Sequence, residues 1–271
     1  MPGPSVTSRA LAVLGAFDDR HLRLGLSEIA RRAGLPLTTT HRLVAELVAW
    51  QALERRADGA YVVGRRIWQL GLLAPVQLEL REVARPFMQD LYDTTRENVH
   101  LAVREDLRAL YVELISGRGS VPVLSRPGAA LPLHATGVGK VLLAYAGPEV
   151  VRRALVAPER VTRYTVVEPG RLRRELSEVR RRGYARTVEE MTLGTCSVAV
   201  PVLDAGGTVV AALGLVTRTA RRDLPRLAPA VRVAAAGVTR VLVAIDFRSG
   251  DFRSGDFRSG DFRSPEAPGR G

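Results

Sequence analysis

A chain of 271 residues, 46% of them hydrophobic, is long enough for two domains and a substantial buried core. One cysteine and four histidines exclude an internal disulfide and show no metal-ligand spacing, so we expect no metal ion and no cofactor. Forty basic against 28 acidic residues give a net charge of +12, which favours a polyanionic partner such as nucleic acid. We find no export signal and no membrane-spanning run, and therefore expect a cytoplasmic protein without a membrane partner.

The positive charge is unevenly distributed along the chain. Residues 1–75 contain ten Arg and six acidic residues, a net charge of +4, whereas residues 152–186 contain eleven Arg and four Glu, a net charge of +7. The second stretch is typical of a solvated helix face, and we interpret it in this way rather than as a nucleic-acid surface.

The first quarter of the chain predicts three helices and a hairpin. Apolar residues recur at helical spacing, with Thr7 or Ser8 available to cap the first helix and Gly34 placed to end the second. An Asp-Gly pair then separates two alternating segments, which indicates a β-hairpin. The expected elements are helices at 7–17, 26–33 and 38–50 and a hairpin at 53–63.

The remaining sequence predicts a mixed α/β domain behind a connecting helix at 75–97. Asp204 and the Gly206-Gly207 pair between two apolar runs indicate a hairpin, which favours an antiparallel sheet flanked by helices. The tail from residue 246 repeats DFRS four times and is too polar to bury a core, so we expect it to be disordered. Strands are expected at 99–103, 109–115, 198–203 and 208–216, and helices at 137–146, 171–182 and 226–243.

The segment Leu26–Leu47 fits a helix-turn-helix. Such a motif needs a small residue where its helices touch and a backbone that bends between them, which Ala30 and Gly34 supply. Polar residues on the outer surface could then contact phosphates or base edges, and the hairpin could act as a wing, although capping, packing or solvated roles are also open. The candidate DNA-binding residues are Ser27, Thr38, Thr39, Thr40, His41, Arg42, Arg55 and Arg56.

From about Ser8 to Val243 the chain resembles the isocitrate lyase regulator (IclR) family of bacterial transcription factors. The segments that carry the resemblance are SRALAVLGAF, LSEIARRAGLPLTTTHRLVAEL, YVVGRRIWQLG, ENVHLAV, LPLHATGVGKVLLA, RRGYARTVEE and GTCSVAVPVLDAGGTVVAALGL. The resemblance implies an α+β multidomain protein with a winged helix-turn-helix, a linker helix used in dimerisation, and a GAF-like α/β effector-binding domain with an antiparallel sheet. The expected boundaries are 4–66 for the winged domain, 67–85 for the linker, 86–245 for the effector domain and 246–271 for the tail.

The segment LPLHATGVGK, residues 131–140, is not a phosphate-binding loop, because His134 and Val141 stand where that loop needs a glycine and a Ser or Thr. It can still be a glycine-rich turn that opens a helix, either purely structural or able to hold a carboxylate on free N–H groups.

The resemblance further implies which residues contact the effector, because family members that sense small oxoacids use the matching positions for this purpose. Two leucines stand where those members have serines, which makes the pocket more apolar and favours an aromatic acid whose carboxylate Arg186 could pair. The implied effector-binding residues are Gly137, Val138, Arg186 (or its neighbour Thr187), Cys196, Leu213 and Leu215.

No residue set in the sequence is a convincing catalytic centre. Cys196 would need a base such as His134 to act as a nucleophile, and a small buried thiol is the favoured interpretation. Glu189 and Glu190 are adjacent, point different ways in a regular element, and are expected to be solvated or to cap a turn.

We therefore expect a transcription regulator, not an enzyme. A homodimer or tetramer would bind a pseudo-palindromic double-stranded operator, and a small-molecule effector would change the relation between the two winged domains. The alternative is an enzyme domain acting on a small acid and fused to a DNA-binding control module. A third possibility is a nonspecific architectural DNA binder. Such a protein would concentrate its positive charge in the DNA-binding domain, whereas in this chain the most basic stretch lies outside that domain.

Overall fold

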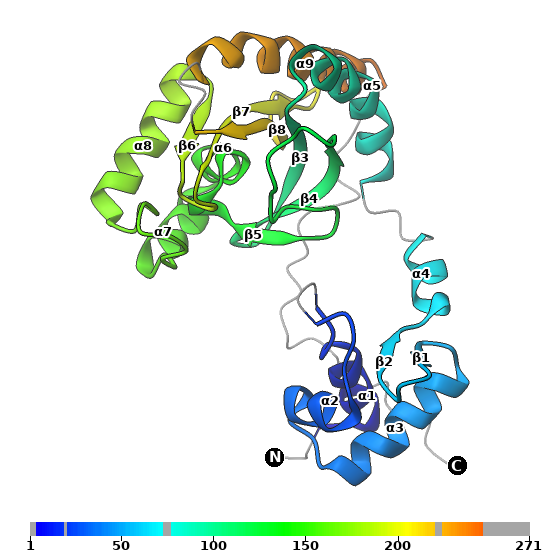
Figure 1. Cartoon of the computed structure of the whole chain (residues 1–271). Coiled ribbons are helices and arrows are strands. Elements are labelled where there is room, and N and C mark those ends of the chain that lie inside the picture. Colours follow the sequence, from blue (N-terminus) through cyan, green and yellow to red (C-terminus); the bar gives the residue numbers. More distant parts are fainter. Residues whose placement is uncertain (1–3, 19–20, 73–76, 220–223, 246–271) are drawn as a thin grey trace, which may run out of the picture. The chain divides into compact units, whose positions relative to one another are not determined.

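The computed structural model describes residues 4–18, 21–72, 77–219 and 224–245, which fall into two compact units divided after Val76 (Figure 1). Each unit has its own hydrophobic core. The repeat tail, predicted to be disordered, lies outside the described residues.

The N-terminal unit is a three-helix domain with a small hairpin. Val13, Ile29 and Leu43, one from each helix, are at most 2% exposed and meet in its core. The first helix is capped by the Ser5 side chain, which accepts from the Ser8 backbone N–H, rather than by Thr7 or Ser8. The elements are α1 Val6–Leu14, α2 Leu26–Ala33, α3 Leu37–Ala49, β1 Leu53–Arg55, β2 Tyr61–Val63 and α4 Arg65–Leu72.

Helices α2 and α3 form the predicted helix-turn-helix. Gly34 ends α2 in the left-handed region at φ 66°, which glycine adopts without steric cost, and Ala30 is buried as the motif requires. The backbone N–H of Leu35 donates to the Ala30 carbonyl and closes the turn. The hairpin β1–β2 follows α3 with antiparallel pairing, as the sequence predicted.

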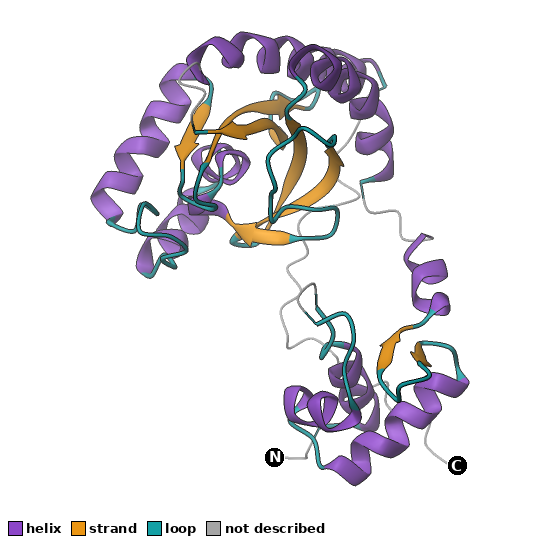
Figure 2. Cartoon of the chain, viewed as in Figure 1, coloured by secondary structure: helices purple, strands orange, loops and turns teal. Residues whose placement is uncertain are grey.

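The second unit is a six-stranded antiparallel sheet with helices on both faces (Figure 2). The strand order is β5-β4-β3-β8-β7-β6, and the predicted Asp204 hairpin joins β7 to β8. Helices α5 and α9 cover one face, and α6, α7 and α8 pack over the other. The elements are α5 Leu78–Thr95, β3 Asn98–Glu105, β4 Arg108–Ile115, β5 Ala130–Pro132, the 3-10 turn Leu133–Ala135, α6 Gly137–Ala144, α7 Pro148–Val156, α8 Pro169–Arg182, β6 Ala185–Val188, β7 Thr195–Leu203, β8 Val209–Arg218 and α9 Leu224–Ala244.

The linker expected at 67–85 is divided between the two units. Its first part is in α4, whereas Leu80 and Ala84 are fully buried in the core of the second unit as part of α5. The structural boundary therefore lies between Val76 and Gln77. Leu80 and Ala84 pack on the sheet of the second unit, so they belong to that unit and not to a connection between domains. Strands β5 and β6 and helix α7, which the sequence did not predict, are short elements at the margin of this unit.

By its length and composition alone, helix α9 is apolar enough over Arg226–Ala244 to span a membrane. This corrects the expectation that the sequence contains no membrane-spanning run. The reason is its Ala and Val content, which makes more than one side of the helix apolar. Val231, Ala235, Val238 and Leu242 recur at helical spacing, are buried, and belong to the core beside the sheet. These contacts are those of a core helix.

Candidate effector pocket and DNA-binding surface

A cavity lies between the sheet and the N-terminus of α6, and we call it the α6 pocket. It contains about 490 Å³ of empty space, a volume that includes open solvent. Strands β3, β4, β6, β7 and β8 form its floor, and residues 123–125 and 191–192 form its sides. The lining residues are His100, Tyr111, Val123, Leu124, Ser125, Leu131, Thr136, Gly137, Val138, Thr187, Met191, Thr192, Thr195, Ser197, Val198, Ala199, Gly214, Leu215 and Val216.

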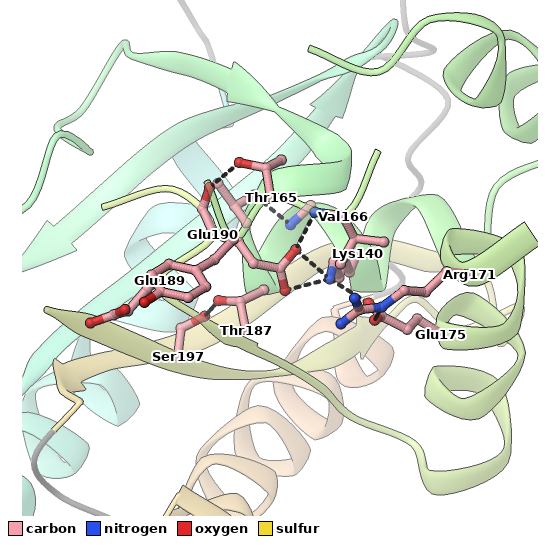
Figure 3. A network of polar contacts seen from close by, with 12 residues as sticks. Lys140, Thr165, Val166, Arg171, Glu175, Thr187, Glu189, Glu190 and Ser197 are labelled. Carbon is pink, nitrogen blue, oxygen red and sulfur yellow. Dashed lines mark hydrogen bonds and ion pairs between the residues drawn. The ribbon is translucent and has the colours of Figure 1, made fainter. Parts of the chain in front are cut away.

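The floor of the α6 pocket carries polar side chains on otherwise apolar strands. The hydroxyl groups of Thr187 and Ser197 lie 2.6 Å apart on neighbouring strands and form a hydrogen bond (Figure 3). His100 on β3 is 3.2 Å from the Ser125 hydroxyl through Nε2, and its ring stands edge-on to Tyr111 at 5.3 Å. These groups can orient a polar ligand atom above the sheet.

The N-terminus of α6 opens directly into this pocket. Thr136 caps the helix by accepting from the Gly139 N–H, and Gly137 and Val138 follow as its first two residues. First-turn N–H groups have no partner inside a helix, and the helix dipole adds partial positive charge there. Gly137 also allows the α6 backbone to lie close to the Ser197 side chain, since a Cβ at this position would be 2.4 Å from the Ser197 hydroxyl oxygen.

None of the residues that line the α6 pocket is Asp, Glu, Lys or Arg. His100 adds no charge at neutral pH, because burial lowers its pKa to about 3. Burial likewise raises the pKa of Tyr111, so that its hydroxyl stays protonated. The only positive potential that the pocket lining provides therefore comes from the α6 dipole and N–H groups, which suit one carboxylate better than two.

Behind the helix N-terminus, Lys140 is buried in an ion-pair network (Figure 3). Its ammonium group donates to Glu190 at 2.7 and 2.8 Å and to Glu175 at 2.6 Å. Burial raises the pKa of Glu190, and the Lys140 ammonium offsets part of that rise. Because Glu190 directly precedes the pocket residues Met191 and Thr192, the network holds α6 and this loop together.

The structure brings three of the six predicted effector residues to the α6 pocket: Gly137, Val138 and Leu215. The Leu215 side chain nevertheless belongs to the core cluster on the α5–α9 side of the sheet. Cys196 and Leu213 do not line the pocket, because strand alternation directs them into that same core. Arg186 lies on the opposite side of β6 from Thr187, which takes its predicted place in the pocket.

The residues considered for catalysis have structural roles. The Cys196 thiol lies 3.5 Å from the Arg218 carbonyl, and burial raises its pKa to about 11, which makes it a poor nucleophile at neutral pH. His134 hydrogen-bonds the Glu159 carbonyl through Nε2 at 2.8 Å. Glu189 accepts from the Gly194 N–H, a capping role as predicted, whereas Glu190 is buried beside Lys140 instead of solvated.

Helix α3 presents a polar outer surface. Thr38, His41, Arg42 and Ala45 are exposed and recur at i, i+3, i+4 and i+7, so they share one side of the helix. Thr40 is fully buried and donates to the Pro36 carbonyl, which corrects its prediction as a DNA contact, since its side chain packs inside the motif. Ala45, which the sequence did not single out, adds a methyl group of the kind that contacts thymine.

Other predicted DNA contacts lie at the ends of these elements. Ser27 is exposed in the first turn of α2, and Thr39 is half-buried at the start of α3. In the hairpin, Arg55 lies over the Tyr61 ring, whereas Arg56 is paired with Glu54 at 2.8 Å. Arg55 is therefore better placed than Arg56 to bind a phosphate, because the Arg56 guanidinium is already paired with a carboxylate.

Comparison with known proteins identifies the fold and its function. The model of the IclR helix-turn-helix domain matches residues 6–57, and that of the bacterial transcriptional regulator IclR C-terminal domain matches residues 74–240. This chain belongs to the IclR family of transcriptional regulators. It is therefore a regulator and not an enzyme, and we call its second unit the effector domain.

Relatives of this regulator match along most of its length. It is 32% identical to the HTH-type transcriptional regulator XynR of Escherichia coli, over 84% of this chain and 92% of the relative. It is 36% identical to the glycerol operon regulatory protein of Streptomyces coelicolor, over 87% and 95%. A crystal structure of an IclR homologue from Microbacterium hydrocarbonoxydans complexed with 4-hydroxybenzoate is 37% identical, with a TM-score of 0.81 over 88% of this chain and 99% of that chain.

We expect His100 to make the stability of the regulator sensitive to acid. Its folded pKa is far below that of an unfolded histidine, so the unfolded state binds more protons below about pH 6.5 and stability falls there by about 1.4 kcal/mol per pH unit. In His100→Gln this contribution disappears. Urea unfolding of the effector domain at about pH 7.5 and about pH 5 should show a smaller stability loss in the variant. His134, whose pKa burial also lowers, is common to both proteins, so an equal loss in both would contradict the assignment.

Proposed function

We propose that the regulator binds an aromatic monocarboxylate in the α6 pocket and that this changes its affinity for operator DNA. The observation that carries the proposal is a pocket with a helix N-terminus at one end, no lining Asp, Glu, Lys or Arg, and apolar walls. A carboxylate would take the free N–H groups of Gly137 and Val138, with the Thr187 and Ser197 hydroxyls beside it. Val123, Leu131 and Met191 would surround an aromatic ring.

The geometry and a solved relative point to the same ligand class. The Microbacterium homologue holds 4-hydroxybenzoate, an aromatic ring with one carboxylate. A second negative charge would be unfavourable in the α6 pocket, because no basic side chain lines it to compensate for desolvation. The pocket therefore favours monoanions over dianions and over neutral amides, which gain less from the helix dipole.

On the DNA side, we propose that Thr38, His41, Arg42 and Ala45 of α3 enter the major groove. Ser27 and Arg55 would contact the phosphate backbone. We further propose a cytoplasmic homodimer, or a tetramer built from two such dimers, without a membrane partner. Helix α4 supports self-association, because Trp68 is 62% and Leu70 is 47% exposed, and a second copy would cover them.

Isothermal titration of the full chain with three aromatic probes tests the ligand class. We expect 4-hydroxybenzoate to bind at least about tenfold more tightly than the neutral 4-hydroxybenzamide or the dianion terephthalate, a difference of about 1.4 kcal/mol or more. Gly137→Ala should weaken 4-hydroxybenzoate binding by a similar factor, because its Cβ would displace Ser197. Gly147→Ala is the matched control, since its Cβ meets nothing within 4 Å. Equal affinity for all three probes would exclude a carboxylate site at α6.

A further inference from the structure

The effector domain has a second hollow, whose lining residues are all different from those of the α6 pocket. It runs between helix α8, the segment 160–168 and strand β6, with about 1570 Å³ of empty space that includes open solvent. We call it the arginine groove. Its charged lining residues are Lys140, Arg160, Arg163, Glu168, Arg171, Glu175, Glu178, Arg182, Arg186 and Glu190.

The acidic residues of the arginine groove are already engaged. Glu175 and Glu190 pair with Lys140, and Glu175 also pairs with Arg171 at 3.3 Å. Glu178 accepts from Arg182 at 2.8 Å. The remaining carboxylate, Glu168, accepts from the Gly170 and Arg171 backbone N–H groups and caps α8.

Three arginines in the same groove have no acidic partner among the described residues. Arg160 donates to the Arg163 carbonyl at 3.4 Å, and Arg163 lies over the Tyr164 ring at 4.9 Å. Arg186 reaches the groove from β6, where its backbone pairs with β7, and no hydrogen bond or ion pair joins its guanidinium group to the described part of the chain. All three are exposed, so their guanidinium groups are free to turn toward a ligand.

We propose that the arginine groove is a second ligand site, for a small molecule that carries at least two negative charges on phosphate groups. Guanidinium groups bind phosphate oxygens through paired N–H donors, and three of them around one hollow favour a multivalent anion. The exposed ring of Tyr164 at the groove could pack against the rest of such a molecule. The two pockets thereby separate ligands by charge: the α6 pocket lacks basic side chains, and the arginine groove has an excess of them.

The basic stretch 152–186 accordingly has two kinds of arginine. Arg173 and Arg174 are exposed on α8 and do not line the groove, in agreement with the solvated helix face expected from the sequence. Arg160, Arg163 and Arg186 line one hollow although Arg186 is far along the stretch from the other two.

Titration of the full-length protein with inorganic pyrophosphate, at constant ionic strength, tests the site. We expect one pyrophosphate per chain, bound equally well in the presence of 4-hydroxybenzoate. The triple substitution Arg160→Ala, Arg163→Ala and Arg186→Ala should weaken binding at least tenfold. The control triple Arg118→Ala, Arg173→Ala and Arg240→Ala, which removes the same charge from exposed positions outside the groove, should leave it within about twofold.

Three results would overturn the proposal: no pyrophosphate binding, equal losses in the two triple variants, or competition between pyrophosphate and 4-hydroxybenzoate. A loss of operator binding in the groove variant alone would also overturn it, by making the groove a DNA contact. Because 4-hydroxybenzoate is titrated separately, failure of the α6 pocket proposal would not affect this outcome. Circular dichroism melting of both triple variants checks that they are folded.

Discussion

Lys140→Met is expected to lower the free energy of unfolding of the effector domain by about 3–5 kcal/mol, because it leaves a buried carboxylate without its counter-charge. Lys140 is 1% exposed and the Glu190 side chain 8% exposed, so water cannot replace the lost ammonium group. Glu175 is 32% exposed and keeps Arg171, so it can turn to solvent at little cost. Methionine preserves most of the side-chain volume, which limits the effect to the charge.

A double variant separates charge from packing in this prediction. Lys140→Met combined with Glu190→Leu removes both buried charges and should recover much of the lost stability, as replacement of buried ion pairs by apolar residues often does. The single variant should also become less destabilised as pH falls, since a carboxyl whose pKa burial raises is disfavoured only when ionised. Urea unfolding monitored on the effector domain measures both effects. A double variant as unstable as the single one, with no pH dependence, would show that Lys140 acts through shape alone.

Arg42→Ala is expected to weaken operator binding by about 1–3 kcal/mol, roughly fivefold to a hundredfold, if Arg42 contacts a guanine edge. The side chain is exposed on α3 beside His41, and no ion pair within the described chain restrains it. Fluorescence anisotropy with operator DNA measures the loss. Binding of 4-hydroxybenzoate should not change, because Arg42 and the α6 pocket belong to different units.

Two comparisons make the Arg42 prediction specific. Arg240→Ala removes the same charge from the exposed surface of α9 and should leave operator affinity within about twofold. A base contact should also relax sequence preference at one operator position, whereas a phosphate contact should weaken all sequences equally and reduce the salt dependence. Equal losses in Arg42→Ala and Arg240→Ala would leave only general charge attraction.

The DNA-binding motif could be predicted from sequence because its contacts are local. Ala30, Gly34 and the apolar positions of α2 and α3 all lie within the short segment Leu26–Leu47, and the left-handed turn at Gly34 has a direct signal in glycine. The N-terminus of α6 was found for the same reason, since Thr136 and Gly137 form a local cap.

The rest of the α6 pocket could not be predicted, because both faces of its strands are apolar. Strands β7 and β8 are buried on each side by helices, so the sequence shows no alternation that says which residues face α6. Cys196 and Leu213, predicted as effector contacts, lie instead in the core on the α5–α9 side of the sheet. A weak signal was present in His100 and Ser197, which are polar residues inside otherwise apolar strands.

The Lys140 network was missed for a different reason. A single lysine in the apolar helix GVGKVLLA signals a buried charge that needs a partner. The partners, however, are 35 and 50 residues further along the chain, at distances that no local spacing rule covers.

The most direct test of the account is binding of the purified regulator to the intergenic DNA upstream of its own gene, with and without 4-hydroxybenzoate, across a salt series. The account predicts a preference over unrelated DNA of about a thousandfold that persists at physiological salt, and a shift in that affinity when the ligand is added. Equal binding to both fragments that disappears as salt rises, unaffected by the ligand, would contradict it and leave only charge attraction.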